Sequence, residues 1–77
     1  MRFYVTEISI PKDEGQTSIL THEITNEDAD TAFNDAMSTY HSICGIKRAD
    51  NTVKRHICTI TAESGAQVIG EAYEKKE

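Results

Sequence analysis

The hydrophobic period changes twice along this 77-residue chain, and no other feature of the sequence constrains the fold as much. Residues 3–24 follow the two-residue alternation of strands and are rich in β-branched and aromatic types, with a break at Pro11. From Thr25 the apolar residues recur about every 3.6 positions, as on a helix, and residues 52–73 return to a period of two. This order predicts one helix between two β-hairpins, a fold of the α+β class.

The expected strands span residues 3–10, 17–24, 52–62 and 66–73, and the expected helix runs from about Asn26 to Cys44. Gly45 follows the last apolar residue of the helical pattern, which predicts a left-handed residue at the helix end. Gly65 is expected to hold the left-handed position of a three-residue hairpin loop, and residues 74–77 to form a charged tail. The length allows one domain, residues 1–77, with ββαββ order and a mainly antiparallel four-stranded sheet covered by the helix on one face.

One helix cannot cover both faces of such a sheet. The small residues of the fourth strand, Val68, Gly70 and Ala72, are expected to face the helix. The opposite face then carries an apolar set that serves as a candidate homodimer surface: Ile57, Ile69 and Tyr73, joined by Phe3 and Val5. The alternative is a curled sheet on which these side chains shade one another.

Negative charge is concentrated in the first half of the chain. The formal net charge is −5, and residues 1–38 hold eight acidic side chains against two basic ones. This balance argues against direct nucleic-acid binding and favours docking on a basic protein groove. The candidate partner-binding residues are the acidic ones at and around the helix start: Glu23, Glu27, Asp28, Asp30 and Asp35.

The sequence gives little support for catalysis or for a cofactor. It contains no phosphate-binding glycine loop, no dinucleotide fingerprint and no nucleophile elbow. One set has a nominal zinc-ligand spacing: His41, Cys44, His56 and Cys58. Since Cys44 lies in the apolar stripe of the helix, we expect buried thiols and no metal, although a single disulfide remains open.

No apolar run approaches the length that spans a bilayer, so the protein is expected to be cytoplasmic and not to bind membranes. Residues 32–41, 53–60 and 68–73 resemble parts of small uncharacterised proteins encoded by phages and prophages of Gram-positive bacteria. The resemblance covers about the last two thirds of the chain, and the Glu63-Ser64-Gly65 turn departs from the Asp/Asn-Gly turn of that group. It implies a viral origin, hence the host cytoplasm, and no defined activity.

Two hypotheses of function follow. In the first, the protein is a non-enzymatic inhibitor similar to anti-CRISPR and other counter-defence proteins, and its acidic residues occupy the basic groove of a host protein in place of phosphates. In the second, it is a phage structural or assembly accessory protein that oligomerises through its open sheet face. The first predicts binding that weakens steeply with salt, and the second predicts salt-insensitive association.

Overall fold

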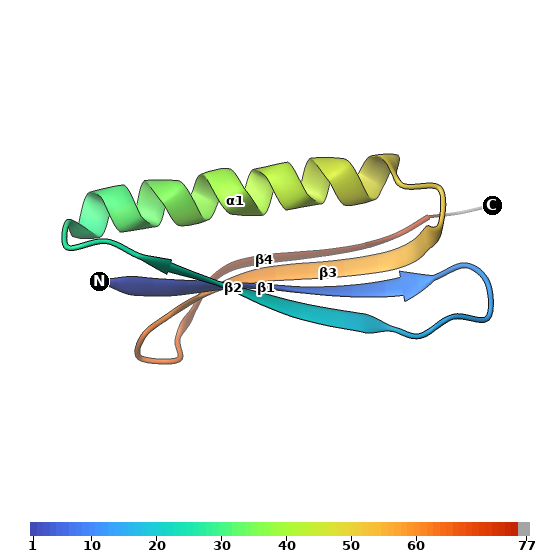
Figure 1. Cartoon of the computed structure of the whole chain (residues 1–77), viewed down its shortest axis with the longest axis horizontal. Coiled ribbons are helices and arrows are strands. Elements are labelled where there is room, and N and C mark those ends of the chain that lie inside the picture. The colour runs from blue at the N-terminus through green and yellow to red at the C-terminus, as the bar shows by residue number, and fades with distance from the viewer. Residues whose placement is uncertain (76–77) are drawn as a thin grey trace.

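The computed structural model describes residues 1–75 and has the expected element order (Figure 1). Its elements are β1 (Arg2–Pro11), β2 (Ser18–Thr25), α1 (Ala29–Ala49), β3 (Val53–Ala62) and β4 (Gln67–Glu74). The strands form one antiparallel sheet in the order β2-β1-β3-β4, which confirms the α+β prediction. Of the predicted charged tail, Glu74 belongs to β4 and the Lys75 amide donates to the Lys54 carbonyl at 2.8 Å, while residues 76–77 lie outside the described part.

The two hairpins differ in regularity. β1 and β2 pair without interruption from Arg2 opposite Thr25 to Ser9 opposite Ser18. The register between β3 and β4 shifts by one residue next to the turn. At that turn Gly65 has a φ of 90°, so the predicted left-handed glycine is confirmed.

The helix begins later than the sequence predicts. Asn26 is not helical, because its backbone exchanges two hydrogen bonds with the first residue of the chain. Asp28 is the N-cap, and its carboxylate accepts from the Thr31 amide at 3.0 Å. α1 therefore starts at Ala29.

The helix also ends later, and the prediction that Gly45 terminates it is wrong. Gly45 lies inside α1, which continues to Ala49. The additional turn carries Lys47 and Arg48, which find carboxylate partners on the sheet and hold the chain in helical form. Basic side chains in the last turn also interact favourably with the helix dipole.

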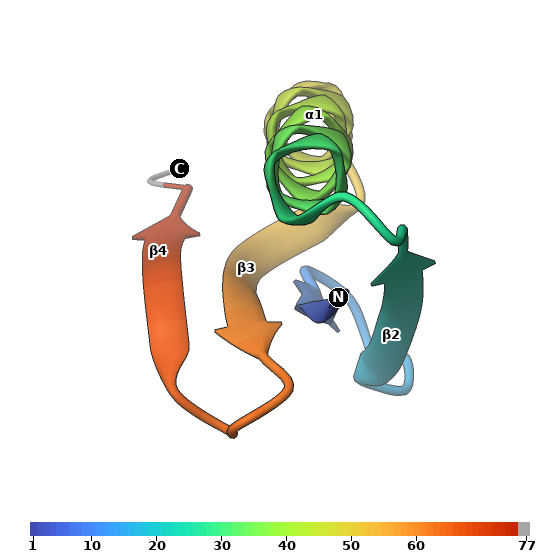
Figure 2. The same cartoon turned by 90° about the vertical axis from the view of Figure 1, so that its left-hand side faces the viewer.

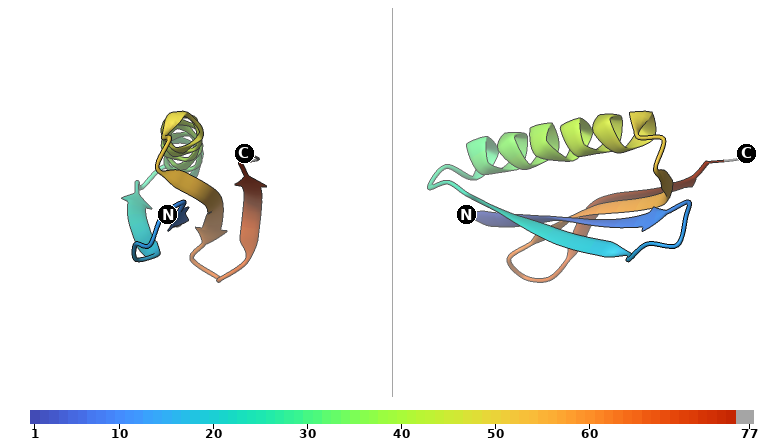
Figure 3. Two further views of the ribbon diagram at one scale, coloured as in Figure 1. Left: turned by 90° about the vertical axis from the view of Figure 1, so that its right-hand side faces the viewer. Right: turned by 45° about the vertical axis from the view of Figure 1, so that its right-hand side comes forward.

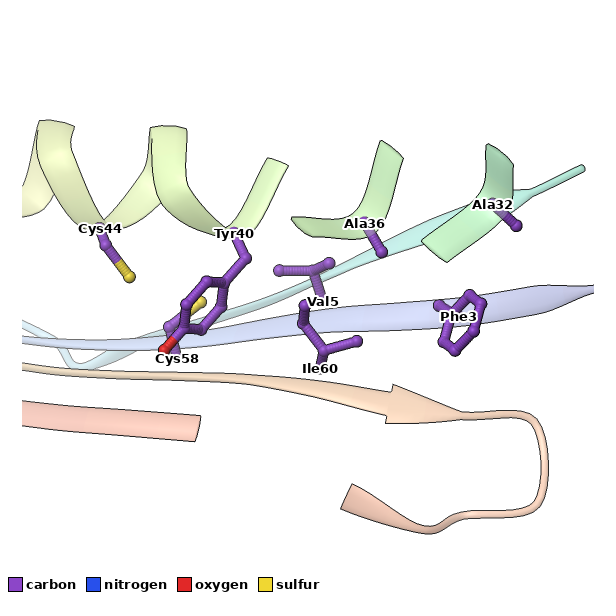
Figure 4. Packing of buried hydrophobic residues seen from close by; sticks show 8 residues of the cluster. All are labelled: Phe3, Val5, Ala32, Ala36, Tyr40, Cys44, Cys58 and Ile60. Atoms are coloured by element: carbon purple, nitrogen blue, oxygen red, sulfur yellow. The ribbon is translucent and has the colours of Figure 1, made fainter. Parts of the chain in front are cut away.

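α1 covers one face of the sheet. It lies above β1 and β3, reaches β2 less closely and stands farther from β4 (Figures 2 and 3). Alanines in its first half allow close approach to the sheet, and Tyr40 fills the space farther along. The core between the two layers consists of Phe3, Val5, Ala32, Ala36, Tyr40, Cys44, Cys58 and Ile60 (Figure 4).

The sheet changes polarity along its strands. The helix-facing residues of β1 run from apolar to polar in the order Phe3, Val5, Glu7 and Ser9. Its other residues run from less to more apolar in the order Tyr4, Thr6, Ile8 and Ile10. β3 repeats this trend, since His56 faces the helix and Ile57 faces away. At one end of the molecule the polar layer is thus the covered one and the apolar layer is the uncovered one.

Candidate functional site

The five acidic residues that the sequence nominates for partner binding do not form one surface. Glu23 lies in β2 and pairs with Arg2 across 2.8 Å. Asp28 accepts hydrogen bonds from the Thr31 amide and hydroxyl, at 3.0 and 2.6 Å, and these hold the pKa of its carboxyl below the usual value. Two of the five carboxylates therefore have structural partners within the chain.

The other three acidic residues are spread around the start of the helix. Glu27 precedes α1, and Asp30 lies in its first turn. Asp35 is five positions farther on, which places it about 140° away from Asp30 around the helix axis. All three are exposed, but they point in different directions from this part of the molecule.

A row of apolar side chains crosses all four strands on the face opposite α1. Directly paired residues of antiparallel strands lie on the same face. The row formed in this way contains Ile19, Ile8, Ile57 and Ala72, one from each strand. Ile10 adjoins it two positions along β1, and we call these five residues the open-face patch. Ile19 is 65% exposed and is the most exposed large hydrophobic side chain among residues 1–75.

The predicted homodimer set is not a single surface. Ile57 belongs to the open-face patch, but Ile69 and Tyr73 lie on the helix side, opposite Ile60 and His56. The small residues Gly70 and Ala72 take the open face instead.

The cause of this reversal is a β-bulge. Near the turn Thr61 pairs with Gln67, whereas one residue along β3 Ile60 pairs with Ile69, so that Val68 is the extra residue. A shift of one residue moves the side chain of every following residue to the opposite face of the sheet.

Phe3 and Val5, expected on the uncovered face, also lie on the helix side. They are 6% and 0% exposed and belong to the core. Ile8 and Ile10 occupy the uncovered face in their place. The strict alternation within β1 places Phe3 and Val5 on the opposite face from Ile8 and Ile10, but it does not show which of the two faces the helix covers.

A shallow hollow lies on the uncovered side of β3 and β4. Its volume is about 250 Å³, and its lining residues are Ile57, Thr59, Gln67, Gly70, Glu71 and Ala72. The hollow exists partly because Gly70 has no side chain. On this face it lies at the edge of the sheet opposite to the one that carries Ile19.

Sequence reasoning missed a buried polar cluster on the helix side. Glu7 is 4% exposed, and three basic groups surround its carboxylate. The His22 Nε2 atom lies 3.0 Å from Oε2, and Lys47 Nζ and His56 Nε2 each lie 3.8 Å from Oε1. A buried carboxylate requires such partners, and through Lys47 this cluster fixes the last turn of α1 to the sheet.

Other polar atoms next to this cluster are buried as well. The Ser9 hydroxyl, both ring nitrogens of His56 and the Tyr73 hydroxyl have no hydrogen-bond partner among residues 1–75. Burial lowers the pKa of His56, although attraction by Glu7 opposes this effect. Burial raises the pKa of Tyr73. His56 is therefore neutral at pH 7.

The structure brings Cys44 and Cys58 of the nominal zinc set together in the core, but it leaves His41 apart from them. Cys44 and Cys58 are free, buried thiols of the core, and His41 is exposed on the helix. Burial raises the pKa of both thiols, that of Cys58 to about 12, which keeps them protonated. Within residues 1–75 no group of three or more histidine, cysteine or acidic side chains is arranged to hold a metal ion.

No protein-family model matches the chain, and comparisons with curated proteins and with solved structures find no significant match. In the described part of the chain, α1 lacks the long apolar stretch that a membrane-crossing helix needs.

Proposed function

We propose that this protein is an assembly module, not an enzyme, and that it associates with a second copy through the open face of its sheet. The observation that carries the proposal is the open-face patch. Four isoleucines and an alanine lie on the face that α1 does not cover, at the end of the molecule where the covered layer is polar; Ile19 and Ala72 are exposed, and Ile8, Ile10 and Ile57 are half-buried. Burying that patch would supply the apolar contact that the helix side lacks at this end.

Burial of the whole open face, and not of the patch alone, reaches the lower limit of area for a specific interface. Strands spaced about 4.8 Å apart, each with about eight residues at 3.4 Å, present about 500 Å² on one four-stranded face. Two copies would bury about 1,000 Å², which is near the lower limit for a specific protein interface.

The shape of the face is complementary to itself. Ile19 protrudes at the β2 edge, and the hollow beside Gly70 lies at the β4 edge. We place a two-fold axis between the two copies, parallel to the strands and in line with the space between β1 and β3. This axis brings Ile19 of each copy over Ala72 and the hollow of the other copy. The same axis sets Ile8 against Ile57 of the second copy. Such an arrangement is isologous and closes as a dimer.

The test replaces one apolar side chain of the face by lysine and measures the oligomeric state by analytical ultracentrifugation over a range of concentrations. We expect the unmodified protein to dimerise and both Ile57→Lys and Ile19→Lys to be monomeric. The matched control is Ile46→Lys, because Ile46 is 63% exposed on α1, away from the open face. This control is expected to dimerise like the unmodified protein.

Salt separates this association from a charge-driven one. Hydrophobic pairing is expected to persist between low and high salt, whereas attraction between exposed charges weakens. A protein that stays monomeric at millimolar concentration would contradict the proposal. Equal dimerisation of all three lysine variants would also do so, since the contact would then lie elsewhere.

A further inference from the structure

The hydrogen bonds at the start of the sheet define which backbone groups of β2 are unused. Met1 and Asn26 exchange two hydrogen bonds, at 2.6 and 3.0 Å, and their pairing continues the β1–β2 register. In an antiparallel ladder, pairs that exchange bonds alternate with pairs that do not. The amide and carbonyl groups directed away from β1 therefore belong to the alternate residues Ile19, Thr21, Glu23 and Thr25.

This edge has few of the features by which strands avoid pairing with other chains, and its one acidic residue, Glu23, is paired with Arg2. β2 has eight residues in uninterrupted register, contains neither proline nor glycine, and exposes 65% of Ile19 and 52% of Leu20. The opposite edge, β4, has a bulge at its start and carries two glutamates. Strand addition is thus favoured at β2 over β4.

The charges at the ends of β2 identify the partner. Asp13 and Glu14 precede the strand, Glu27 and Asp28 follow it, and all four are exposed. In antiparallel pairing of β2 with β2 of a second copy, the start of each strand lies beside the end of the other. Acidic residues of one copy would therefore lie near acidic residues of the other at both ends of the pair. Like charges opposite one another destabilise strand pairing. An extended segment with basic side chains would instead gain attraction at both ends.

We propose that β2 binds an extended, basic segment of another protein by strand addition, with main-chain hydrogen bonds to Ile19, Thr21 and Glu23. Apolar side chains of that segment would pack beside Ile19 on one face, and the aliphatic stems of its basic side chains would pack beside Leu20 on the other. This site shares Ile19 with the dimer contact, but its hydrogen bonds lie along the edge of the sheet and leave Ile8 and Ile57, at the centre of the open face, uncovered.

The experiment titrates the ¹⁵N-labelled protein with a capped octapeptide of alternating lysine and valine, and follows amide chemical shifts and hydrogen exchange. We expect shifts along β2 and slower exchange at Ile19, Thr21 and Glu23. The same peptide with every amide N-methylated is expected to lose binding, and a glutamate–valine peptide is expected to bind at least about tenfold more weakly.

Thr21 offers a matched pair of variants. Proline is tolerated on an edge strand where the amide faces solvent, so Thr21→Pro removes one outward donor without removing a bond to β1. Its hydroxyl contact with Thr6, at 3.2 Å, is lost in Thr21→Val as well. We expect Thr21→Pro to weaken binding about tenfold, which is the value of one hydrogen bond, and Thr21→Val to bind nearly as the unmodified protein does.

Several results would overturn the proposal. These are no binding of the lysine–valine peptide at millimolar concentration, equal binding of the N-methylated or the glutamate peptide, and shifts confined to β4. If hydrogen exchange at the β2 amides slowed with rising protein concentration in the absence of peptide, the partner of β2 would be a second copy of the chain and not a basic segment. The peptide controls use the unmodified protein, so they decide the question even if Thr21→Pro fails to fold.

Binding by the Ile57→Lys variant, which is expected to be monomeric, would show that the two proposals are independent.

Discussion

Glu7 shows how a single buried charge determines which parts of the fold are joined. Its carboxylate lies on the covered face of a central strand and contacts groups from β2, β3 and α1. Removing one partner from such a cluster leaves a charge uncompensated in a water-poor environment, which is costly. At the residue scale the contact between the last turn of α1 and the centre of the sheet is therefore electrostatic, and it responds to pH through His56.

His56 is predicted to make the fold less stable in mild acid. Burial lowers its pKa below the ordinary value of 6.5, so the unfolded chain takes up a proton before the folded one as the pH falls. The free energy of unfolding should decrease from pH 6.5 down to the folded-state pKa of His56. Urea unfolding at pH 7.5, 6.5 and 5.5 measures this slope.

The matched variants for this prediction replace one of two histidines by glutamine. His56→Gln cannot take up the proton, so its stability should depend less on pH over this interval, whatever its absolute stability. His41 is exposed, and His41→Gln should retain the slope of the unmodified protein. Identical slopes in all three proteins would assign the acid sensitivity to another group.

At the scale of elements, α1 contains an unfavourable residue that the structure does not require. An added Cβ at Gly45 meets nothing within 4 Å, and the residue lies in the exposed interior of the helix. Gly65 is different, because its φ of 90° is a conformation that other residues adopt at a cost. The two positions have similar open surroundings and opposite backbone demands.

We predict opposite effects of alanine at these two glycines. Gly45→Ala should raise the free energy of unfolding by about 1 kcal/mol, since glycine is a poor helix former. Gly65→Ala should lower it by about 1 kcal/mol, because the left-handed turn becomes strained. Denaturant unfolding of both variants checks the signs, and a loss of stability in Gly45→Ala would contradict the helical assignment of this residue.

The positions of the strands could be predicted from the sequence, but their faces could be predicted only in part. Pro11 and Gly65 mark turns whose local chemistry does not depend on the rest of the fold. The orientation of β4 depends on one extra residue, Val68, and an alternating pattern does not reveal a bulge. Of the three nominated dimer residues, only Ile57 was therefore placed on the correct face.

The helix ends depended on contacts distant in sequence. The last turn persists beyond Gly45 because Lys47 contacts Glu7 of β1. Arg48 likewise reaches β4, where its guanidinium donates to Glu71 at 2.7 Å. Rules for helix ends consider only neighbouring residues in the sequence, so they predict neither of these two contacts. The acidic residues were predicted as a group for the same reason, since their positions in sequence do not show that Glu23 faces Arg2.

At the scale of the whole molecule, the protein is long and narrow. Its Cα atoms extend over 42 × 19 × 14 Å, and the strands run along the longest dimension (Figure 1). Two sheets that pack face to face keep their strands within about 30° of one another. A dimer formed on the open face is therefore thicker than one copy but hardly longer, because the second copy is added perpendicular to the longest dimension.

Small-angle X-ray scattering distinguishes the possible modes of association. We predict that the scattering mass doubles between dilute and concentrated protein while the maximum dimension stays close to that of one copy. Ile57→Lys provides the single-copy profile under the same conditions. A maximum dimension that nearly doubles would indicate an end-to-end contact and would contradict the face-to-face arrangement.

The exchange of polar and apolar layers along β1 gives the two ends of the molecule different tendencies to open. Near Phe3 the helix is held by close apolar packing. Near Ser9 it is held by the charges around Glu7, and the four isoleucines of the open-face patch lie on the opposite side of the sheet. Transient local unfolding should start where packing is weakest, at the Ser9 end, and spread toward Phe3. A second chain bound on the open-face patch would suppress this local opening, so that the protein would reach its full rigidity only in an assembly.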